Sequence, residues 1–113
     1  MSDHERSFCS TFHRAVELVG RRWAGAIIQT LAQGPTRFAA IRATVQNVTP
    51  RMLAERLREL EAEGVVERRV IDGRPPGVEY SLTPMGRELA EALRPLSAWA
   101  HRWMEGEGER VSG

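Results

Sequence analysis

Side chains able to do chemistry are few in this chain, which has one cysteine, Cys9, and three histidines. Cys9 and His13 stand four residues apart, a spacing that places them on one face of a helix and permits a pair of metal ligands. A structural zinc site uses four protein ligands, and the only other soft candidates are His4 and His101. We therefore expect no metal site and no cofactor.

Catalysis is not expected either. An enzyme needs a nucleophile, a base and an orienting group in one pocket. The two aspartates, Asp3 and Asp72, fall in segments that we expect to be a tail and a loop. The chain has no glycine-rich phosphate loop and no zinc-protease motif. The sequence thus indicates a binding protein, not an enzyme.

The basic residues are more informative, because all 16 of them are arginine. The guanidinium group is a planar fork that suits phosphate groups and the edge of guanine. Coding bias in a GC-rich genome explains the same composition. The net charge is only +1, but residues 37–74 hold eight arginines against six acids, whereas residues 75–113 hold four against six. Any contact with nucleic acid is therefore expected in the middle of the chain.

The length of 113 residues allows one domain with short tails. No stretch approaches the roughly 20 apolar residues of a membrane-spanning helix, and the first ten residues lack the apolar core of a secretory signal. A single cysteine also fits a reducing compartment. We expect a cytoplasmic protein.

The periodicity of apolar residues predicts the elements that must position these arginines. Helical spacing runs through residues 8–19, then through residues 22–32, with Trp23 facing inward, and through a short third segment from Phe38 to about Val45. Residues 36–38 are too short to classify alone, although a short strand fits there, and residues 46–48 favour a turn. In the following helix, residues 50–63, the apolar stripe consists of Leu53, Leu57 and Leu60, and Gly64 ends it.

The second half of the chain predicts a hairpin and a terminal helix. β-Branched residues favour strands at residues 65–71 and 78–82, joined by a loop at 72–77 with two prolines and two glycines. Thr83 and Pro84 begin a helix with Met85, Leu89 and Leu93 inward, which Pro95 breaks or kinks. A short helix, a turn, an amphipathic helix and a hairpin are the layout of a winged helix-turn-helix. The expected fold class is mainly α with a small β-hairpin (α+β).

The helix at residues 50–63 is the predicted recognition helix. Thr49 is a good N-cap and Pro50 suits the first position of a helix. On a helical wheel Arg51, Glu55 and Arg58 lie opposite the leucine stripe, on a face that can enter the major groove. The expected contacts to the bases are Thr49, Pro50, Arg51 and Glu55, with Arg58 on base or backbone. Arg51 can read guanine and Glu55 can accept from cytosine. The alternative is an ordinary solvated helix face.

Further arginines are candidates for contact with the DNA backbone. Arg68, Arg69 and Arg74 lie on or beside the tip of the hairpin, where a wing meets phosphate or the minor groove. Arg21 and Arg22 open the second helix, where backbone N–H groups also favour a phosphate. Simple exposure to solvent explains the positions of Arg21 and Arg22 equally well.

An aromatic stripe near the C-terminus predicts a dimer. Leu96, Trp99, Ala100 and Trp103 follow helical spacing, and a domain of this size has little core in which to bury two indoles. An exposed aromatic stripe is typical of a protein interface. Packing within the core of one chain is the alternative.

Taken together, these residues resemble the HxlR-type winged helix-turn-helix regulators, relatives of the MarR group. Four ordered blocks carry the resemblance, from about Cys9 to about Glu107: CSTFHRAVELVGRRW, GPTRFAAIRATV, NVTPRMLAERLRELEAEGVVERR and RPPGVEYSLTPMGRELAEAL. It implies one DNA-binding domain over residues 9–107, with tails at 1–8 and 108–113. It also implies a homodimeric repressor or activator at a palindromic operator, with residues 10–19 and 96–105, including Phe12, Leu96, Trp99 and Trp103, in the dimer interface.

The resemblance also suggests a role for the cysteine, since many proteins of this type keep a thiol at the position of Cys9 and several sense oxidants or electrophiles with it. Sensing requires a lowered thiol pKa, for which Arg6, His13 and Arg14 can supply positive charge. A thiol without a signalling role is the alternative, and a small-molecule effector is also open. The rival function for the whole chain is a winged helix that contacts only proteins.

Overall fold

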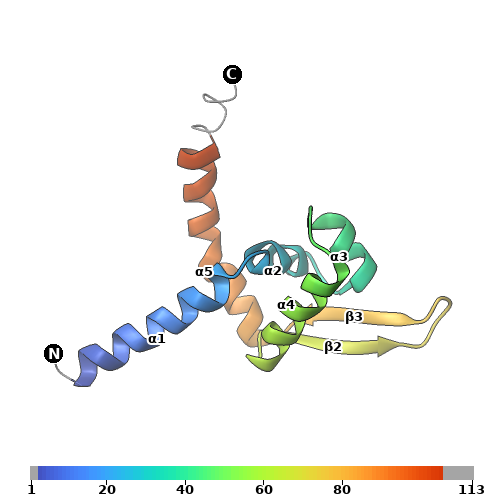
Figure 1. The fold of residues 1–113 in the computed structure, drawn as a ribbon, viewed down its shortest axis with the longest axis horizontal. Helices are drawn as coiled ribbons and strands as arrows, with labels where there is room; N and C mark the ends of the chain where they lie inside the picture. Colours follow the sequence, from blue (N-terminus) through green and yellow to red (C-terminus); the bar gives the residue numbers. More distant parts are fainter. Residues whose placement is uncertain (1–2, 106–113) are drawn as a thin grey trace.

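The computed structural model describes the backbone of residues 3–105 and the side chains of residues 10–104. It confirms a mainly helical fold with a small antiparallel sheet (Figure 1). The elements in chain order are α1 (Asp3–Gly20), α2 (Ala24–Ala32), β1 (Thr36–Arg37), α3 (Phe38–Thr44), α4 (Pro50–Ala62), β2 (Val66–Ile71), β3 (Gly77–Leu82), α5 (Pro84–Ala100) and the single π-helical turn η1 (His101–Glu105).

The sheet has the order β1-β3-β2, so the short strand before α3 pairs with the hairpin. In the register, Arg68 lies opposite Tyr80, and Arg69 lies opposite Glu79. Because successive side chains of a strand point to opposite faces, Tyr80 and Leu82 enter the core while Glu79 lies on the outer face of the sheet. The same alternation places Arg68 and Arg69 on different faces.

The core lies where α2, α3 and α4 pack against the sheet. Leu53, Leu57 and Leu60 are at most 1% exposed, as their spacing predicts. They pack with buried side chains of the other elements: Ile27, Ile28, Leu31, Ile41, Val45, Val48, Val65, Val66, Tyr80 and Leu82. Burial of this stripe fixes which face of α4 is left for solvent.

Local signals at the ends of α4 agree with the sequence. The Thr49 hydroxyl accepts a hydrogen bond from the Met52 amide at 3.1 Å, and Pro50 occupies the first turn. Asn47 in the preceding turn has a φ of 66°, a conformation that asparagine tolerates better than most residues. After the helix, Gly64 has a φ of 82°, the left-handed conformation of a helix C-cap.

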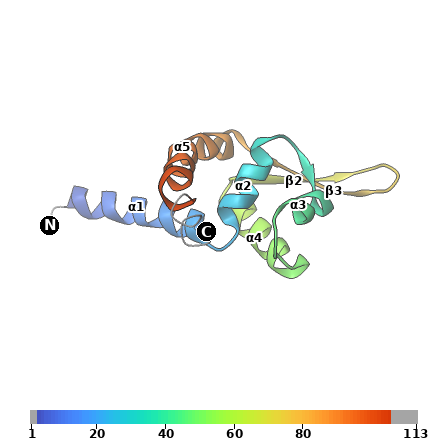
Figure 2. The ribbon, with the colours of Figure 1, turned by 90° about the horizontal axis from the view of Figure 1, so that it is seen from above.

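Helices α1 and α5 extend away from this core as two arms (Figures 1 and 2). The radius of gyration is 16.4 Å, compared with about 13 Å expected for a compact domain of this length. Along the arms Phe12, Leu96, Trp99 and Trp103 are 52–63% exposed. The two terminal tryptophans therefore do not enter the core of this chain, which rules out that alternative.

Three sequence-based expectations differ from the structure in detail. Helix α2 begins at Ala24 and not at residue 22, because Trp23 adopts a left-handed φ of 70° before it. Met85 is 54% exposed and does not enter the core; it lines an open hollow together with Ala15 and Leu18 of α1. Pro95 does not break α5, which continues to Ala100.

Candidate DNA interface

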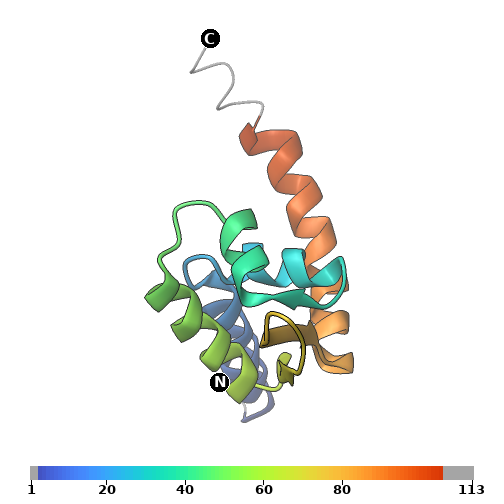
Figure 3. The same ribbon diagram turned by 90° about the vertical axis from the view of Figure 1, so that its right-hand side faces the viewer.

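The face of α4 opposite its leucine stripe, here called the outward face, carries the side chains that the helical wheel predicts. Arg51, Glu55 and Arg58 are exposed, and Thr49 and Pro50 are exposed at the start of the helix. Among the described residues, neither Arg51 nor Arg58 forms an ion pair. Their guanidinium groups are available to an external anion or base. Seen from the tip of the hairpin, the hairpin loop lies between α4 and the first turns of α5, with α3 above α4 (Figure 3).

The inner flank of α4 is held by an ion-pair network that the sequence analysis missed. Arg56, whose side chain is 14% exposed, donates to both carboxylate oxygens of Glu59 at 2.8 and 2.9 Å, and its Nε donates to the carbonyl of Arg22 at 3.2 Å. Glu59 also lies 3.5 Å from Arg21. The network ties α4 to the turn between α1 and α2, and its only sequence signal is the Arg56–Glu59 spacing of one helical turn.

The two arginines of that turn, predicted to meet the DNA backbone, have partners within the chain. Arg21 pairs with Glu59, and the guanidinium of Arg22 stacks on the ring of Trp23, 4.4 Å from the centroid. Trp23 in a left-handed conformation is unusual for a bulky residue, and the bond from Arg56 to the Arg22 carbonyl holds the backbone beside it. Both arginines remain exposed.

The hairpin separates its arginines by face. Arg68 emerges on the face that bears Tyr80 and on which the helices pack. Arg69 lies on the outer face, and its guanidinium contacts the Glu79 carboxylate at 3.1 Å. Arg74 is exposed in the loop between β2 and β3. The structure thus brings Arg68 to the same side of the sheet as α4 and places Arg69 on the other side.

Arg37 contacts the hairpin loop, and the sequence did not assign it to the site. It ends β1 and directly precedes α3, and its Nη1 donates to the carbonyl of Pro75 in the hairpin loop at 3.0 Å. The available signal was the Arg37–Phe38 pair within one of the blocks that carry the family resemblance.

Cys9 belongs to the backbone of α1, but its side chain, like that of Arg6, lies outside the described residues. The other two basic side chains expected near it have partners elsewhere. His13 Nε2 lies 2.8 Å from the Glu17 carboxylate, and Arg14 lies 3.3 Å from Glu63 at the end of α4. Within the described part of the chain, no three His, Cys, Asp or Glu side chains gather as metal ligands.

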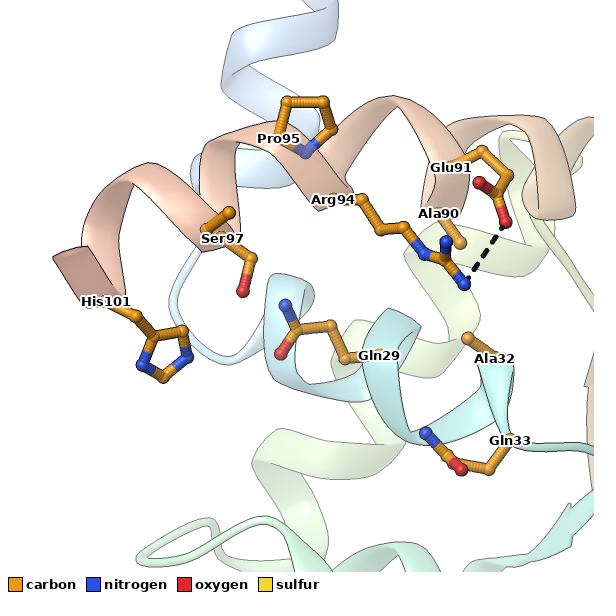
Figure 4. A pocket seen from close by; sticks show the side chains of 10 residues that line it. Gln29, Ala32, Gln33, Ala90, Glu91, Arg94, Pro95, Ser97 and His101 are labelled. Carbon is orange, nitrogen blue, oxygen red and sulfur yellow. Dashed lines mark ion pairs between the residues drawn. The ribbon is translucent and has the colours of Figure 1, made fainter.

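A cleft of about 830 Å³ lies between α2 and α5, lined by side chains of both helices (Figure 4). Gln29 of α2 and Gln33, directly after α2, line it on one side, and Ser97 of α5 and His101 in the turn after α5 line it on the other. Arg94 at its rim lies 3.7 Å from Glu91. The cleft offers hydrogen-bonding groups to solvent and adjoins the arm that carries Trp99.

None of the described helices is long and apolar enough to cross a bilayer.

Comparisons with known proteins agree with this geometry. The HxlR-like helix-turn-helix family model matches residues 18–108. YvaP of Bacillus subtilis, described as an uncharacterized HTH-type transcriptional regulator, is 42% identical over 102 residues, which are 90% of this chain and 94% of YvaP. The HTH-type transcriptional regulator YodB of the same organism is 40% identical over 99 residues, 88% of each chain.

Solved structures of such regulators have the same fold. Reduced YodB superposes with a TM-score of 0.69 at 39% identity, covering 94% of this chain and 97% of YodB. The redox regulator HypR in its oxidized form gives a TM-score of 0.75 at 36% identity, covering 81% of this chain and 95% of HypR. With its winged helix-turn-helix fold and a family match over most of its length, this chain belongs to the HxlR-like helix-turn-helix family.

Proposed function

We propose that this protein is a transcriptional regulator that binds double-stranded DNA sequence-specifically as a homodimer. The observation that carries the proposal is the outward face of α4, where Arg51 and Arg58 are exposed without an ion-pair partner among the described residues. Helix α4 lies beside a protruding hairpin, as a recognition helix lies beside its wing (Figure 3). Membership of the HxlR-like family supports the same function.

Each part of the interface has a physical task in this proposal. Arg51, at the N-terminal end of α4, reads the edge of guanine with two parallel hydrogen bonds, and Glu55 accepts from cytosine. Arg58 and Thr49 contact base or backbone at the two ends of this face. Arg68 and Arg74 neutralise phosphates and fix the register of the protein without reading sequence.

The exposed apolar faces of the arms support a homodimer. Phe12 and Val16 on α1 and Leu96 and Trp99 on α5 are about half exposed or more, at spacings that put each pair on one face of its helix, and exposed apolar faces mark interaction sites. A second copy covers them with the same surface, as in a two-fold interface. A two-fold axis presents two α4 helices to half-sites about 34 Å apart on DNA, which requires a palindromic operator.

The direct test is a fluorescence anisotropy titration against the intergenic DNA upstream of the protein's own gene and against a scrambled duplex. We expect tighter binding to the native DNA, two chains per site, and an affinity that falls steeply with salt because several phosphates are neutralised. Equal affinity for both duplexes over a series of upstream fragments would favour the rival function, a winged helix that contacts proteins. A regulator of the chromosome acts in the cytoplasm, where we place it.

A response to oxidants is the second part of the proposal. Solved structures of YodB include diamide-treated and quinone-bound forms, and HypR has an oxidized form. In this chain the thiol is that of Cys9 on the α1 arm. Two thiols of a dimer joined by diamide lose two hydrogen atoms, which reduce the diamide to its hydrazide. Diamide is then expected to release DNA from the wild type but not from Cys9→Ser. Equal release from both proteins would exclude Cys9 as the sensor.

A further inference from the structure

Arg37 connects the start of the helix-turn-helix to the hairpin. It is the last residue of β1 and the residue directly before α3. In the sheet it lies opposite Glu79 of β3, so the two side chains emerge on the same, outer face. Gly77 is two residues along the same strand and therefore belongs to this face as well.

The Arg37 side chain runs along that face toward the hairpin loop, residues 72–76. Its Nη1 donates to the Pro75 carbonyl at 3.0 Å. A Cβ atom placed on Gly77 would lie 3.3 Å from Nη1 and 4.0 Å from both Cδ and Cζ. The guanidinium therefore lies directly over Gly77, and the missing side chain at that position makes room for it. Gly77 does not have a left-handed φ, so the backbone does not require glycine there.

The acid nearest to Arg37 in the sheet is already paired with another arginine, and Arg37 binds the loop. Glu79, the acid that faces Arg37 across the strands, contacts Arg69 at 3.1 Å. The Arg37 guanidinium instead binds a backbone carbonyl, and a hydrogen bond from a charged donor is about twice as strong as a neutral one. A two-stranded ribbon that protrudes from its domain is only marginally stable by itself. A bond from β1 to its loop therefore restrains the part of the ribbon farthest from the core.

We infer that Arg37 is a positioning residue for the wing, which holds loop 72–76 so that the neighbouring Arg74 meets a DNA phosphate, without touching DNA itself. The inference rests on the proposed function, because it assigns Arg37 a role through a wing contact. It also makes a statement about the free protein, namely that the loop is ordered by this bond.

The first experiment examines the free protein, so that its outcome does not depend on DNA binding. Backbone ¹⁵N order parameters of Gly73 and Arg74 are measured in the wild type, Arg37→Met and Gly77→Val. Both variants are expected to lower them from near 0.85 toward 0.6 or less, one by removing the donor and the other by occupying its place. Gly73→Ala is the matched control, because its Cβ would make only ordinary contacts of 3.8 Å. Unchanged order parameters in both variants would overturn the inference.

The second experiment is a double-mutant cycle on operator DNA over a range of salt. Arg37→Met and Gly77→Val are each expected to lower the salt slope by about 0.9 per subunit, the loss of one phosphate contact, and to weaken binding roughly five- to tenfold per subunit at 0.1 M salt. In an Arg74→Ala background neither is expected to weaken binding further. Additive losses, or a loss with Arg37→Met but none with Gly77→Val, would mean that Arg37 contacts DNA directly and would overturn the inference. If wild-type protein shows no preference for operator DNA, the proposed function fails, while the order parameters still decide the role of Arg37.

Discussion

Arginines of identical chemistry have different roles in this protein, and their partners within the chain separate these roles. Arg56 and Arg69 pair with Glu59 and Glu79, and Arg37 binds a loop carbonyl. Arg51 and Arg58 face solvent on α4 without such partners among the described residues. An arginine already paired with a carboxylate contributes little to the binding of phosphate, so Arg51 and Arg58 are expected to contribute more to DNA affinity than Arg56 and Arg69.

Arg51 is the residue whose loss is expected to change sequence preference. Arg51→Ala removes a two-pronged donor at the N-terminal end of α4, and a base contact of this kind contributes about 1–3 kcal/mol of discrimination. Specific binding should therefore weaken by about tenfold or more in anisotropy titrations, with much less change on scrambled DNA. A matched control is Glu61→Ala, exposed near the far end of the same helix. A uniform loss on all duplexes would contradict base reading by Arg51.

The strand register makes a paired prediction for two adjacent arginines. Arg68→Ala should lower the salt slope of DNA binding by about 0.9 per subunit, because Arg68 lies on the helix-packed face of the hairpin. Arg69→Ala should leave the slope unchanged, because Arg69 lies on the outer face and already contacts Glu79. The salt dependence of binding measures both, and equal slopes in the two variants would show that the face of the strand does not matter.

Among the secondary-structure elements, the sequence placed α4, β2, β3 and the start of α5 within one or two residues. The reason is that their signals are local: caps at Thr49 and Thr83, a left-handed glycine at Gly64, and regular apolar spacing. It misplaced the start of α2, because Trp23 adopts a left-handed conformation beside Arg22, whose carbonyl accepts a hydrogen bond from Arg56 of α4, and a contact between residues 34 positions apart leaves no local signal.

The close packing of Gly86 against the backbone of Val65 predicts a large loss of stability when a side chain is added at Gly86. A Cβ on Gly86 in the first turn of α5 would lie 2.0 Å from the carbonyl oxygen of Val65, which is backbone and cannot rotate away. Gly86→Ala should therefore destabilise the fold by about 3 kcal/mol, the upper range for overpacking, measured by urea unfolding. Gly20→Ala is the control, since no atom lies within 4 Å of its Cβ. Equal urea midpoints for the two variants would show that Gly86 is not packed this tightly against Val65.

The network around Arg56 predicts a second, independent loss. Arg56→Met removes three hydrogen bonds, leaving Glu59 with Arg21 alone and the Arg22 carbonyl without its donor. We expect the free energy of unfolding to fall by about 1–3 kcal/mol. Arg58→Met on the outward face is the matched control and should change it by less than about 0.5 kcal/mol. Similar stabilities of the two variants would show that the network does not hold α4.

For the whole molecule, the exposed faces of α1 and α5 bear on whether the protein is a monomer or a dimer. The body buries its core within a single chain, whereas Phe12, Trp99 and Trp103 remain more than half exposed on helices that extend from it (Figure 2). Such exposed faces favour association of two copies.

A charge on the arm is therefore expected to separate the dimer. Trp99→Glu should reduce the mass measured by analytical ultracentrifugation from about twice to once the 12.7 kDa of one chain, because a carboxylate buried at an apolar interface is strongly unfavourable. Val70→Glu, which replaces another exposed apolar residue but on the hairpin, should leave the mass unchanged. A wild-type protein with the mass of one chain would refute the dimer.

The sequence by itself determined the order of the elements, the buried stripe of α4 and the face of α4 that remains exposed, because each follows from spacing and caps within about a dozen neighbouring residues. Only the tertiary structure decided which arginines are already engaged. Arg37 meets Pro75, Arg14 meets Glu63 and Arg21 meets Glu59 across 38 to 49 residues of chain. The physical reason is that an ion pair depends on the distance between two charges in space, which register and packing set and local sequence does not.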